Sequence, residues 1–416
     1  MIAAKLVVGI DFSDKYTLIS TCHDPSEGVV TWSGKKDNED FRVPVAAFKL
    51  PGSDRWVFGD EAVERAESFG MKYDTDILAK ALSAGERGMD HRTSPEIVLL
   101  GRYLSYLLRL PPETATSRVN ALCITEREVH PFSKKVFEEA MKSTGIGIPS
   151  IRVISYGESF FFYALSQPIG LWRNGALLYD YSDGLFESDY LSIDHSTAPA
   201  IVSDIRKKHG DMTPFYGSDR RKMDEKFLSI TMEDMKKSVS GTYLTGEAFN
   251  ERWEQRTLRY ICTRSRVFKG QNLYSKGACY SAADDVDLIR ISRRYLYLGQ
   301  DSLLTNVSLR AISQGREALL PIADAGSKWY ESSKSMEVLL GHDRELIVVL
   351  TDIKDRSERN AVIRLDWMPM RPERASRVKV EFEFLSAKRL RVKVTDLGFG
   401  EIFRATGEKR KEEIKL

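Results

Sequence analysis

Residues 6–22 read LVVGIDFSDKYTLISTC, and residues 175–193 read GALLYDYSDGLFESDYLSI. Each stretch predicts an apolar strand that ends at an aspartate, Asp11 or Asp180, followed by a tight turn and a second strand. A strand–turn–strand unit of the same kind therefore occurs twice in the chain. This recurrence indicates two related α/β halves.

The segments that follow the first unit alternate between helices and strands. Residues 93–110 carry apolar side chains at helical spacing, and the pair Pro111–Pro112 stops this helix. A buried strand at 119–124, a helix at about 131–143 and a strand at 151–154 form a crossover unit typical of an α/β layer. Further helices are expected at 158–166, 221–239 and 249–263.

From about residue 287 the pattern changes to short strands separated by turns, which is typical of a β-sandwich. Residues 378–384 read VKVEFEF, so one face of this strand is expected to be buried and the other wet. The charged tail at 407–415 is expected to fray. We therefore expect three parts, with a domain boundary at 284–290: an α/β lobe at 1–170, a second lobe at 171–286 and a β-sandwich at 290–416.

The composition is that of an ordinary globular protein and excludes collagen-like and wholly disordered chains: of 416 residues, 42% are hydrophobic and 29% charged. Lys and Arg number 62 against 60 Asp and Glu, so no global field attracts nucleic acid or anionic lipid. Four scattered cysteines indicate neither a disulfide framework nor a zinc site. The apolar runs are shorter than the ~18 residues that span a bilayer, and the first ten residues do not resemble a signal peptide. We therefore expect a reduced, cytoplasmic protein without a membrane segment or a nucleic-acid partner.

An aspartate at the end of a strand can orient a hydrated Mg²⁺ while the backbone N–H groups of the turn bind phosphate. Two such turns at corresponding points of two halves indicate a cleft that holds a nucleotide from both sides. The alternative is that Asp11 and Asp180 only cap their turns, because aspartate side chains readily bond to nearby backbone.

The segment Gly9-Ile-Asp11-Phe12, followed by Gly59-Asp-Glu-Ala62, resembles the opening of the actin, sugar-kinase and heat-shock ATPase superfamily. Within that superfamily it is most similar to the DnaK-type heat-shock chaperones. The resemblance implies an actin-like α/β ATPase fold of two related lobes, the second one reduced, followed by a peptide-binding β-sandwich. The other similar segments, in chain order, are 77–82, 121–147, 154–164, 179–187, 243–248, 276–282, 320–322, 336–341 and 376–382.

The resemblance also implies site residues, with ATP or ADP and Mg²⁺ as cofactors. The residues implied to orient Mg²⁺ are Asp11 and Asp180. The implied catalytic residues are Lys80, near the γ-phosphate, Asp180, and Glu187, which would position water. The residues implied to bind nucleotide are Asp11, Phe12, Ser13, Lys15, Gly184, Gly246 and Gly277. For two of these residues an ordinary role stays open, since Lys80 fits a solvated lysine on a helix and Glu187 fits an exposed carboxylate.

Both turns depart from the family's pattern. The first aspartate is followed by Ser13-Asp14-Lys15 where the family has Gly-Thr-Thr, and in the second turn only Gly184 remains of three glycines. Side chains at such positions keep phosphate away from the backbone N–H groups, and Asp183 adds negative charge. The segment 195–241 is also shorter than its counterpart in the family, so most of the subdomain that closes over adenine should be missing.

Two functions follow from these observations. The first is a divergent ATP-dependent chaperone, in which nucleotide changes how the β-sandwich holds a polypeptide. The second is a non-catalytic scaffold that keeps the fold, has lost productive ATP binding and binds a partner protein. The altered turns favour weak or absent hydrolysis, while the retained Asp11, Lys80 and Asp180 favour activity. A filament-forming actin relative is disfavoured, because a terminal β-sandwich is foreign to such polymers.

Overall fold

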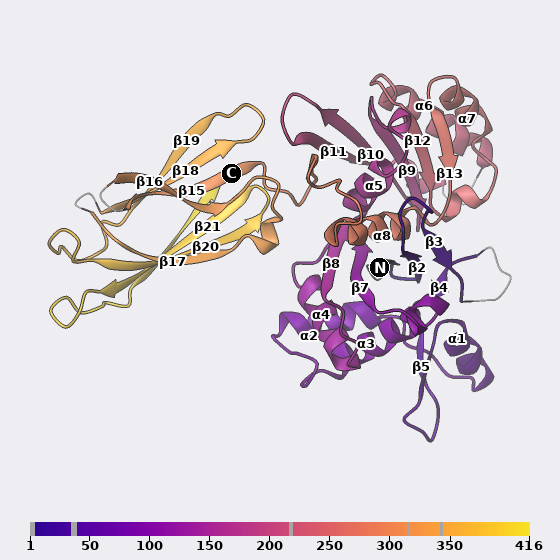
Figure 1. The fold of residues 1–416 in the computed structure, drawn as a ribbon, viewed down its shortest axis with the longest axis horizontal. Coiled ribbons are helices and arrows are strands. Elements are labelled where there is room, and N and C mark those ends of the chain that lie inside the picture. Colours follow the sequence, from indigo (N-terminus) through magenta and orange to yellow (C-terminus); the bar gives the residue numbers. More distant parts are fainter. Residues whose placement is uncertain (1–4, 35–39, 216–218, 314–315, 342–343) are drawn as a thin grey trace. The chain divides into compact units, whose positions relative to one another are not determined.

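The computed structural model describes residues 5–34, 40–215, 219–313, 316–341 and 344–416 (Figure 1). The chain divides into two compact units, Met1–Tyr295 and Leu296–Leu416. The division falls after the predicted boundary at 284–290 because the connecting residues are bonded to the first unit. The carboxylate of Asp284 accepts hydrogen bonds from the backbone N–H groups of Ile291, at 2.6 Å, and Ser292, at 3.2 Å.

The first sheet of unit 1 has the strand order β3-β2-β1-β7-β8, and β4 also pairs with β2. β1 pairs antiparallel with β2 and parallel with β7, and β8 continues the parallel side. The strands are β1 (Leu6–Phe12), β2 (Tyr16–Cys22), β3 (Val30–Trp32), β4 (Val43–Pro44), β7 (Val119–Glu126) and β8 (Ser150–Ser155). This topology brings the end of β1, with Asp11, beside the end of β7.

Three helices share the core of this sheet: α2 (Ile77–Glu86), α3 (Pro95–Leu108) and α4 (Ser133–Thr144). α3 begins at Pro95, two residues after the predicted start of 93, because the Ser94 side chain caps the helix by accepting a hydrogen bond from the N–H of Ile97 at 3.2 Å. Alternate residues of β1, such as Val8 and Ile10, are fully buried in this core. A smaller group consists of β5 (Ala47–Lys49), β6 (Trp56–Phe58) and α1 (Gly59–Ser68).

The second sheet of unit 1 repeats the topology of the first. Five of its six strands run in the order β11-β10-β9-β12-β13, with β9 antiparallel to β10 and parallel to β12. The strands are β9 (Ala176–Ser182), β10 (Leu185–Asp194), β11 (Ala200–Lys208), β12 (Gly241–Thr245) and β13 (Arg266–Lys269). α6 (Arg220–Asp234) and α7 (Gln255–Cys262) supply the helical side of an aromatic-rich core. The repeated hairpin thus belongs to a repeated sheet.

Two helices, α5 (Tyr156–Leu165) and α8 (Leu273–Asp285), lie between the sheets (Figure 1). α8 follows the second sheet in sequence but packs on the first, where a Cβ at Gly9 would lie 2.2 Å from the backbone N of Cys279. α5 contacts the second sheet, with the rings of Phe160 and Tyr243 5.6 Å apart. Because α8 packs across, the contiguous lobes predicted at 1–170 and 171–286 do not describe the packing.

Unit 2 contains two four-stranded sheets that share one hydrophobic core, with orders β16-β15-β18-β19 and β17-β20-β21-β22. β14 (Tyr295–Leu298) spans the division between the units. The other strands are β15 (Thr305–Ser313), β16 (Arg316–Ala323), β17 (Lys334–Leu339), β18 (Glu345–Asp352), β19 (Glu358–Arg364), β20 (Arg377–Ser386), β21 (Arg389–Gly398) and β22 (Lys409–Lys415). Short 3-10 turns along the whole chain are Pro112–Ala115, Ile169–Leu171, Thr213–Phe215, Glu247–Asn250 and Trp329–Glu331.

The prediction of a frayed tail was wrong. Residues 409–415 form β22, which pairs antiparallel with β21. Ile414 is buried in the core of unit 2 opposite Leu390. Backbone hydrogen bonds to β21 hold this charged segment, because such bonds do not depend on the side chains, and Ile414 and Leu416 anchor it to the core.

Candidate functional site

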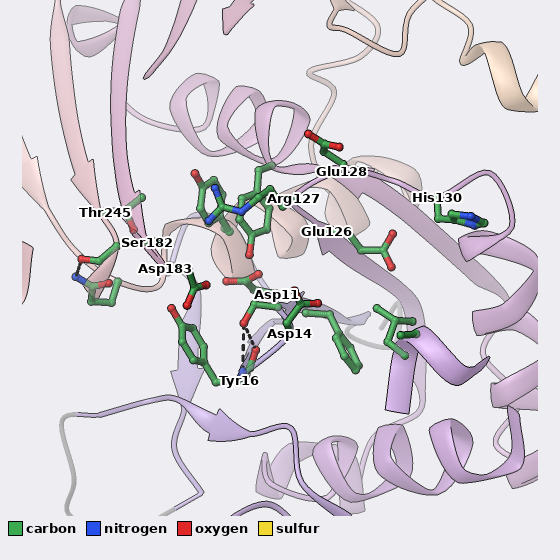
Figure 2. A pocket seen from close by; sticks show the side chains of 18 of the residues that line it. Asp11, Asp14, Tyr16, Glu126, Arg127, Glu128, His130, Ser182, Asp183 and Thr245 are labelled. Atoms are coloured by element: carbon green, nitrogen blue, oxygen red, sulfur yellow. Dashed lines mark hydrogen bonds between the residues drawn. The ribbon is translucent and has the colours of Figure 1, made fainter. Parts of the chain in front are cut away.

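A cavity of about 310 Å³ lies within unit 1, where the β1–β2 and β9–β10 hairpins meet (Figure 2). The two turns contact each other directly, since Lys15 Nζ of the first lies 2.5 Å from Asp183 Oδ1 of the second. We call this cavity the cleft. Its lining also includes residues that follow β7, one face of α2 and the start of α5. The two aspartate hairpins therefore face each other, as the repeated motif predicts.

Arg127 occupies the centre of the cleft, where sequence analysis expects a metal ion. Its Nη1 lies 2.5 Å from Glu187 Oε2, and its Nη2 lies 3.7 Å from Asp180 Oδ2. The guanidinium also lies over the ring of Tyr156, 5.4 Å from its centroid. The side chains of Asp180 and Glu187 are only 2% and 5% exposed. Two buried carboxylates thus share one cation that belongs to the chain itself.

Stacked tyrosines fill the space beside this cation. The rings of Tyr156 and Tyr274 are 3.8 Å apart and nearly parallel. The hydroxyl of Tyr274 donates a hydrogen bond to Asp180 Oδ2 at 2.9 Å, and the hydroxyl of Ser182 donates to the same carboxylate. Asp180 therefore has its partners within the protein.

Burial raises the pKa of both predicted metal-binding aspartates. The pKa of Asp11 rises to about 7, although a hydrogen bond from Tyr156 and the charge of Arg127 act against burial. The pKa of Asp180 rises to about 6 through burial, opposed chiefly by Arg127. Among the described residues, Oδ1 of Asp11 has no hydrogen-bond partner. A buried carboxylate of this kind carries a proton or a cation more easily than an exposed one.

Each turn has backbone N–H groups with partners within the chain. Ser13 N–H donates to the carbonyl of Tyr16 at 3.1 Å, and Tyr16 N–H donates to Ser13 Oγ at 3.2 Å. In the second turn, Asp183 N–H donates to the carboxylate of Glu247. A carboxylate thus takes the donor that a phosphate would use.

Lys80 lies outside the cleft. Its Nζ pairs with Asp74 Oδ2 at 2.7 Å, and it lines a separate cavity of about 700 Å³ next to the start of α3. The face of α2 that lines the cleft carries Leu78, Ala79 and Leu82 instead. Successive residues of a helix point about 100° apart, so residue 80 falls on another face.

The other predicted residues divide between cleft and packing. Phe12 and Ser13 line the cleft, and so does Gly246, whose φ of 100° and close approach to the Tyr181 carbonyl exclude a side chain. Gly184 forms the β9–β10 turn, with a φ of 75°. Gly277 lies where α8 crosses α5, and a Cβ there would be 2.1 Å from the carbonyl oxygen of Ser159. Gly277 therefore serves helix packing.

The residues present do not fit a magnesium triphosphate. Arg127 already pairs with Asp180 and Glu187, so a metal ion would have to displace it. The lining also carries the carboxylates of Asp11, Asp14, Glu126, Glu128 and Asp183. Lys15 and Lys208 pair with only Asp183 and Glu128, so the acidic side chains outnumber these cations and disfavour phosphate. Within the described ranges no cluster of three or more His, Cys, Asp or Glu side chains could hold a metal ion.

Comparison with known families divides the chain near the division between the two units. A family model described as "Family of unknown function (DUF5716) C-terminal" matches residues 29–300, which is more than half of the chain. The chain belongs to this DUF5716 C-terminal family. The DUF5716 match contains Arg127, Asp180 and Glu187 but starts after the β1–β2 hairpin that carries Asp11. A second model, described as "Domain of unknown function (DUF8552)", matches residues 302–416, which lie in unit 2. A search of curated proteins finds no match.

Among the helices of this DUF5716 protein that the structure describes, none combines the length and apolar character that a bilayer crossing needs. Sequence analysis missed Arg127, the central residue of the cleft. The local sequence Glu126-Arg127-Glu128 gives an arginine between two acidic residues and resembles a solvated surface. Only the fold reveals its partners, which lie 53 and 60 positions further along the chain.

Proposed function

We propose that this protein is a non-catalytic protein-interaction scaffold built on a divergent actin-type, DnaK-like fold. The repeated sheets and the facing hairpins support the ancestry. The observation that carries the loss of ATPase activity is the ion pairing of Arg127 with Glu187 and Asp180. In this proposal the guanidinium does permanently what a metal ion would do in an ATPase, because it balances the carboxylates and holds the two lobes together.

The electrostatics of the cleft agree with this role. Arg127 comes from the strand end of the first sheet, while Glu187 and Asp180 come from the second. Lys15 and Asp183 add a second ion pair across the same gap. Opening the cleft for a nucleotide would break both pairs, and desolvated carboxylates without a cation are costly.

Unit 2 offers a surface for a polypeptide partner. In the sheet β16-β15-β18-β19, Leu309 and Val348 face the core, and strand alternation places Leu319 and Val362 on the opposite face. Leu319 is 51% exposed and Val362 is 47% exposed. Exposed apolar side chains on the edge strands of one sheet are typical of surfaces that bind protein. We place the protein in the cytoplasm, where its four free cysteines stay reduced.

A second candidate, a divergent ATP-dependent chaperone, is favoured by one observation. The unpartnered Oδ1 of Asp11 lies in the lining of the cleft, where a cation could bind. Calorimetric titration of the full chain with Mg-ATP and Mg-ADP separates the two functions. The scaffold predicts no binding heat and no shift in the melting of unit 1 at millimolar nucleotide. Saturable binding that Asp11→Asn abolishes would contradict the scaffold and favour a nucleotide-binding function, as the second candidate requires.

A further inference from the structure

One end of the cleft contains a buried acid that the scaffold role leaves unused. Glu126 is the last residue of β7 and is 5% exposed. Its Oε2 accepts a hydrogen bond from the hydroxyl of Ser133 at 2.7 Å. The backbone of His130 also interacts with this carboxylate and opposes the rise in pKa that burial causes, but Oε1 has no partner at ordinary hydrogen-bond geometry among the described residues, although the side chain lines the cleft (Figure 2). A buried carboxylate oxygen without a partner is costly unless a ligand meets it.

The neighbours of Glu126 define the ligand that would suit it. Asp14 also lines the cleft, and its charge is close enough to help burial raise the pKa of Glu126, which reaches about 7. Phe12, Leu78 and Leu82, which pack in one hydrophobic cluster, supply to the lining an apolar surface that we call the apolar wall. The end of the cleft therefore combines negative charge with an apolar surface.

This combination excludes several ligand classes. Phosphates and carboxylates are repelled by the two acids. A hard metal ion requires more oxygen ligands than two carboxylates supply and gains nothing from the apolar wall. A neutral apolar ligand would leave Glu126 Oε1 without a donor. A cationic N–H group on a short carbon chain satisfies both features, because its charge pairs with the carboxylates and its carbons cover the wall.

We propose that this end of the cleft binds an alkylammonium or alkylguanidinium group, with the cation between Asp14 and Glu126 and the carbon chain along Phe12, Leu78 and Leu82. The inference rests on the proposed function, because it assigns the cleft to a ligand other than a nucleotide. The cation can come from a free amine or from a lysine or arginine side chain of a bound polypeptide. Both sources present the same chemistry to Glu126.

The test is a titration of the full chain with n-butylammonium. Binding is measured by calorimetry and by changes in the chemical shifts of unit 1. A probe this small binds weakly, so it is titrated into the millimolar range, and n-butanol serves as the uncharged control. We expect saturable binding of n-butylammonium and none of n-butanol. Capped lysine amide, titrated in the same way, distinguishes the sources: binding at least as tight indicates a polypeptide side chain, and weaker binding indicates a free amine.

Variants locate the site. Glu126→Gln keeps the shape of the side chain and should weaken binding by about tenfold or more. Asp14→Asn, at an exposed position that tolerates change, should weaken it less. Glu64→Gln removes the same charge from α1, away from the cleft, and should leave binding unchanged. Absence of n-butylammonium binding, or equal binding by wild type and both cleft variants, would overturn the inference. Either result is independent of the Mg-ATP titration, which tests the scaffold.

Discussion

Replacing Arg127 by methionine removes the cation from the cleft while keeping an apolar chain of similar length. Asp180 and Glu187 then remain buried, with side chains 2% and 5% exposed, and lose their main partner. Removing one partner of a buried ion pair costs about 3–5 kcal/mol of folding free energy. Two features reduce this cost. Arg127 is itself 25% exposed, and Lys208 Nζ remains 3.9 Å from Glu187 Oε1.

We therefore expect Arg127→Met to lower the free energy of unfolding of unit 1 by about 2–4 kcal/mol. Urea unfolding followed by circular dichroism and tryptophan fluorescence measures this change. The matched control is Arg371→Met in unit 2, which removes the guanidinium that binds Asp396 at 2.7 and 2.8 Å and should destabilise that unit instead. Two separate transitions, each shifted by its own variant, are the expected pattern.

The double variant Arg127→Met/Glu187→Gln sharpens this test. If the cost comes from a buried charge without a partner, removing the charge of Glu187 should restore part of the lost stability. A loss below about 0.5 kcal/mol in the single variant, the range of ordinary surface substitutions, would refute the ion pairing that we assign to Arg127. The ion pairing would also be refuted if Glu187→Gln lowered the stability of the Arg127→Met variant as much as it lowers the stability of the wild type.

Two further predictions concern the cleft and the helix crossing. Burial raises the pKa of Asp11 to about 7 and of Asp180 to about 6, so the folded unit binds protons that the unfolded chain releases above its ordinary pKa of about 4. The unfolding free energy of unit 1, measured by urea titration, should therefore rise as pH falls from about 7 toward about 5. Asp11→Asn should show a weaker rise. A pH profile in this variant equal to that of the wild type would contradict the raised pKa of Asp11. At the crossing of α5 and α8, Gly277→Ala should cost about 1–3 kcal/mol or more, because the new Cβ would lie 2.1 Å from the Ser159 carbonyl oxygen. Gly147→Ala, where a Cβ meets open space, is the control in the same unfolding assay, and equal stability of the two variants would show that the helices are not in close contact.

The sequence is sufficient to predict the parts of the fold that depend on local pattern. Both hairpins form as predicted, although β1 runs one residue past Asp11, to Phe12, and β9 runs two residues past Asp180, to Ser182; the strict alternation of 378–384 marks a real strand, β20. These features follow from burial of alternate residues and from turn chemistry, which act over a few positions. The duplication of the sheets follows from the same two motifs.

The parts that failed depend on contacts between distant residues. Arg206 lies in the basic run Arg206-Lys207-Lys208, a pattern typical of a solvated face, yet its side chain is 6% exposed and pairs with Asp189 of β10 at 2.7 Å. Arg127 and Lys80 also show that residue type and local sequence do not reveal whether a side chain lies in the cleft. The first looks solvated and is central to the cleft, while the second matches a catalytic position and pairs with Asp74 outside it. Helix rotation and strand pairing decide these positions, and neither can be read from residue type.

The central claim is that Arg127 takes the place of a metal nucleotide in the cleft. A crystal structure of the full chain, grown with millimolar magnesium and a non-hydrolysable ATP analogue, tests it most directly. We predict that the guanidinium of Arg127 remains on Glu187 and Asp180, and that no nucleotide density lies between the hairpins. An analogue bound with its phosphates at the Asp183 turn, and with Arg127 displaced from both carboxylates, would contradict the account.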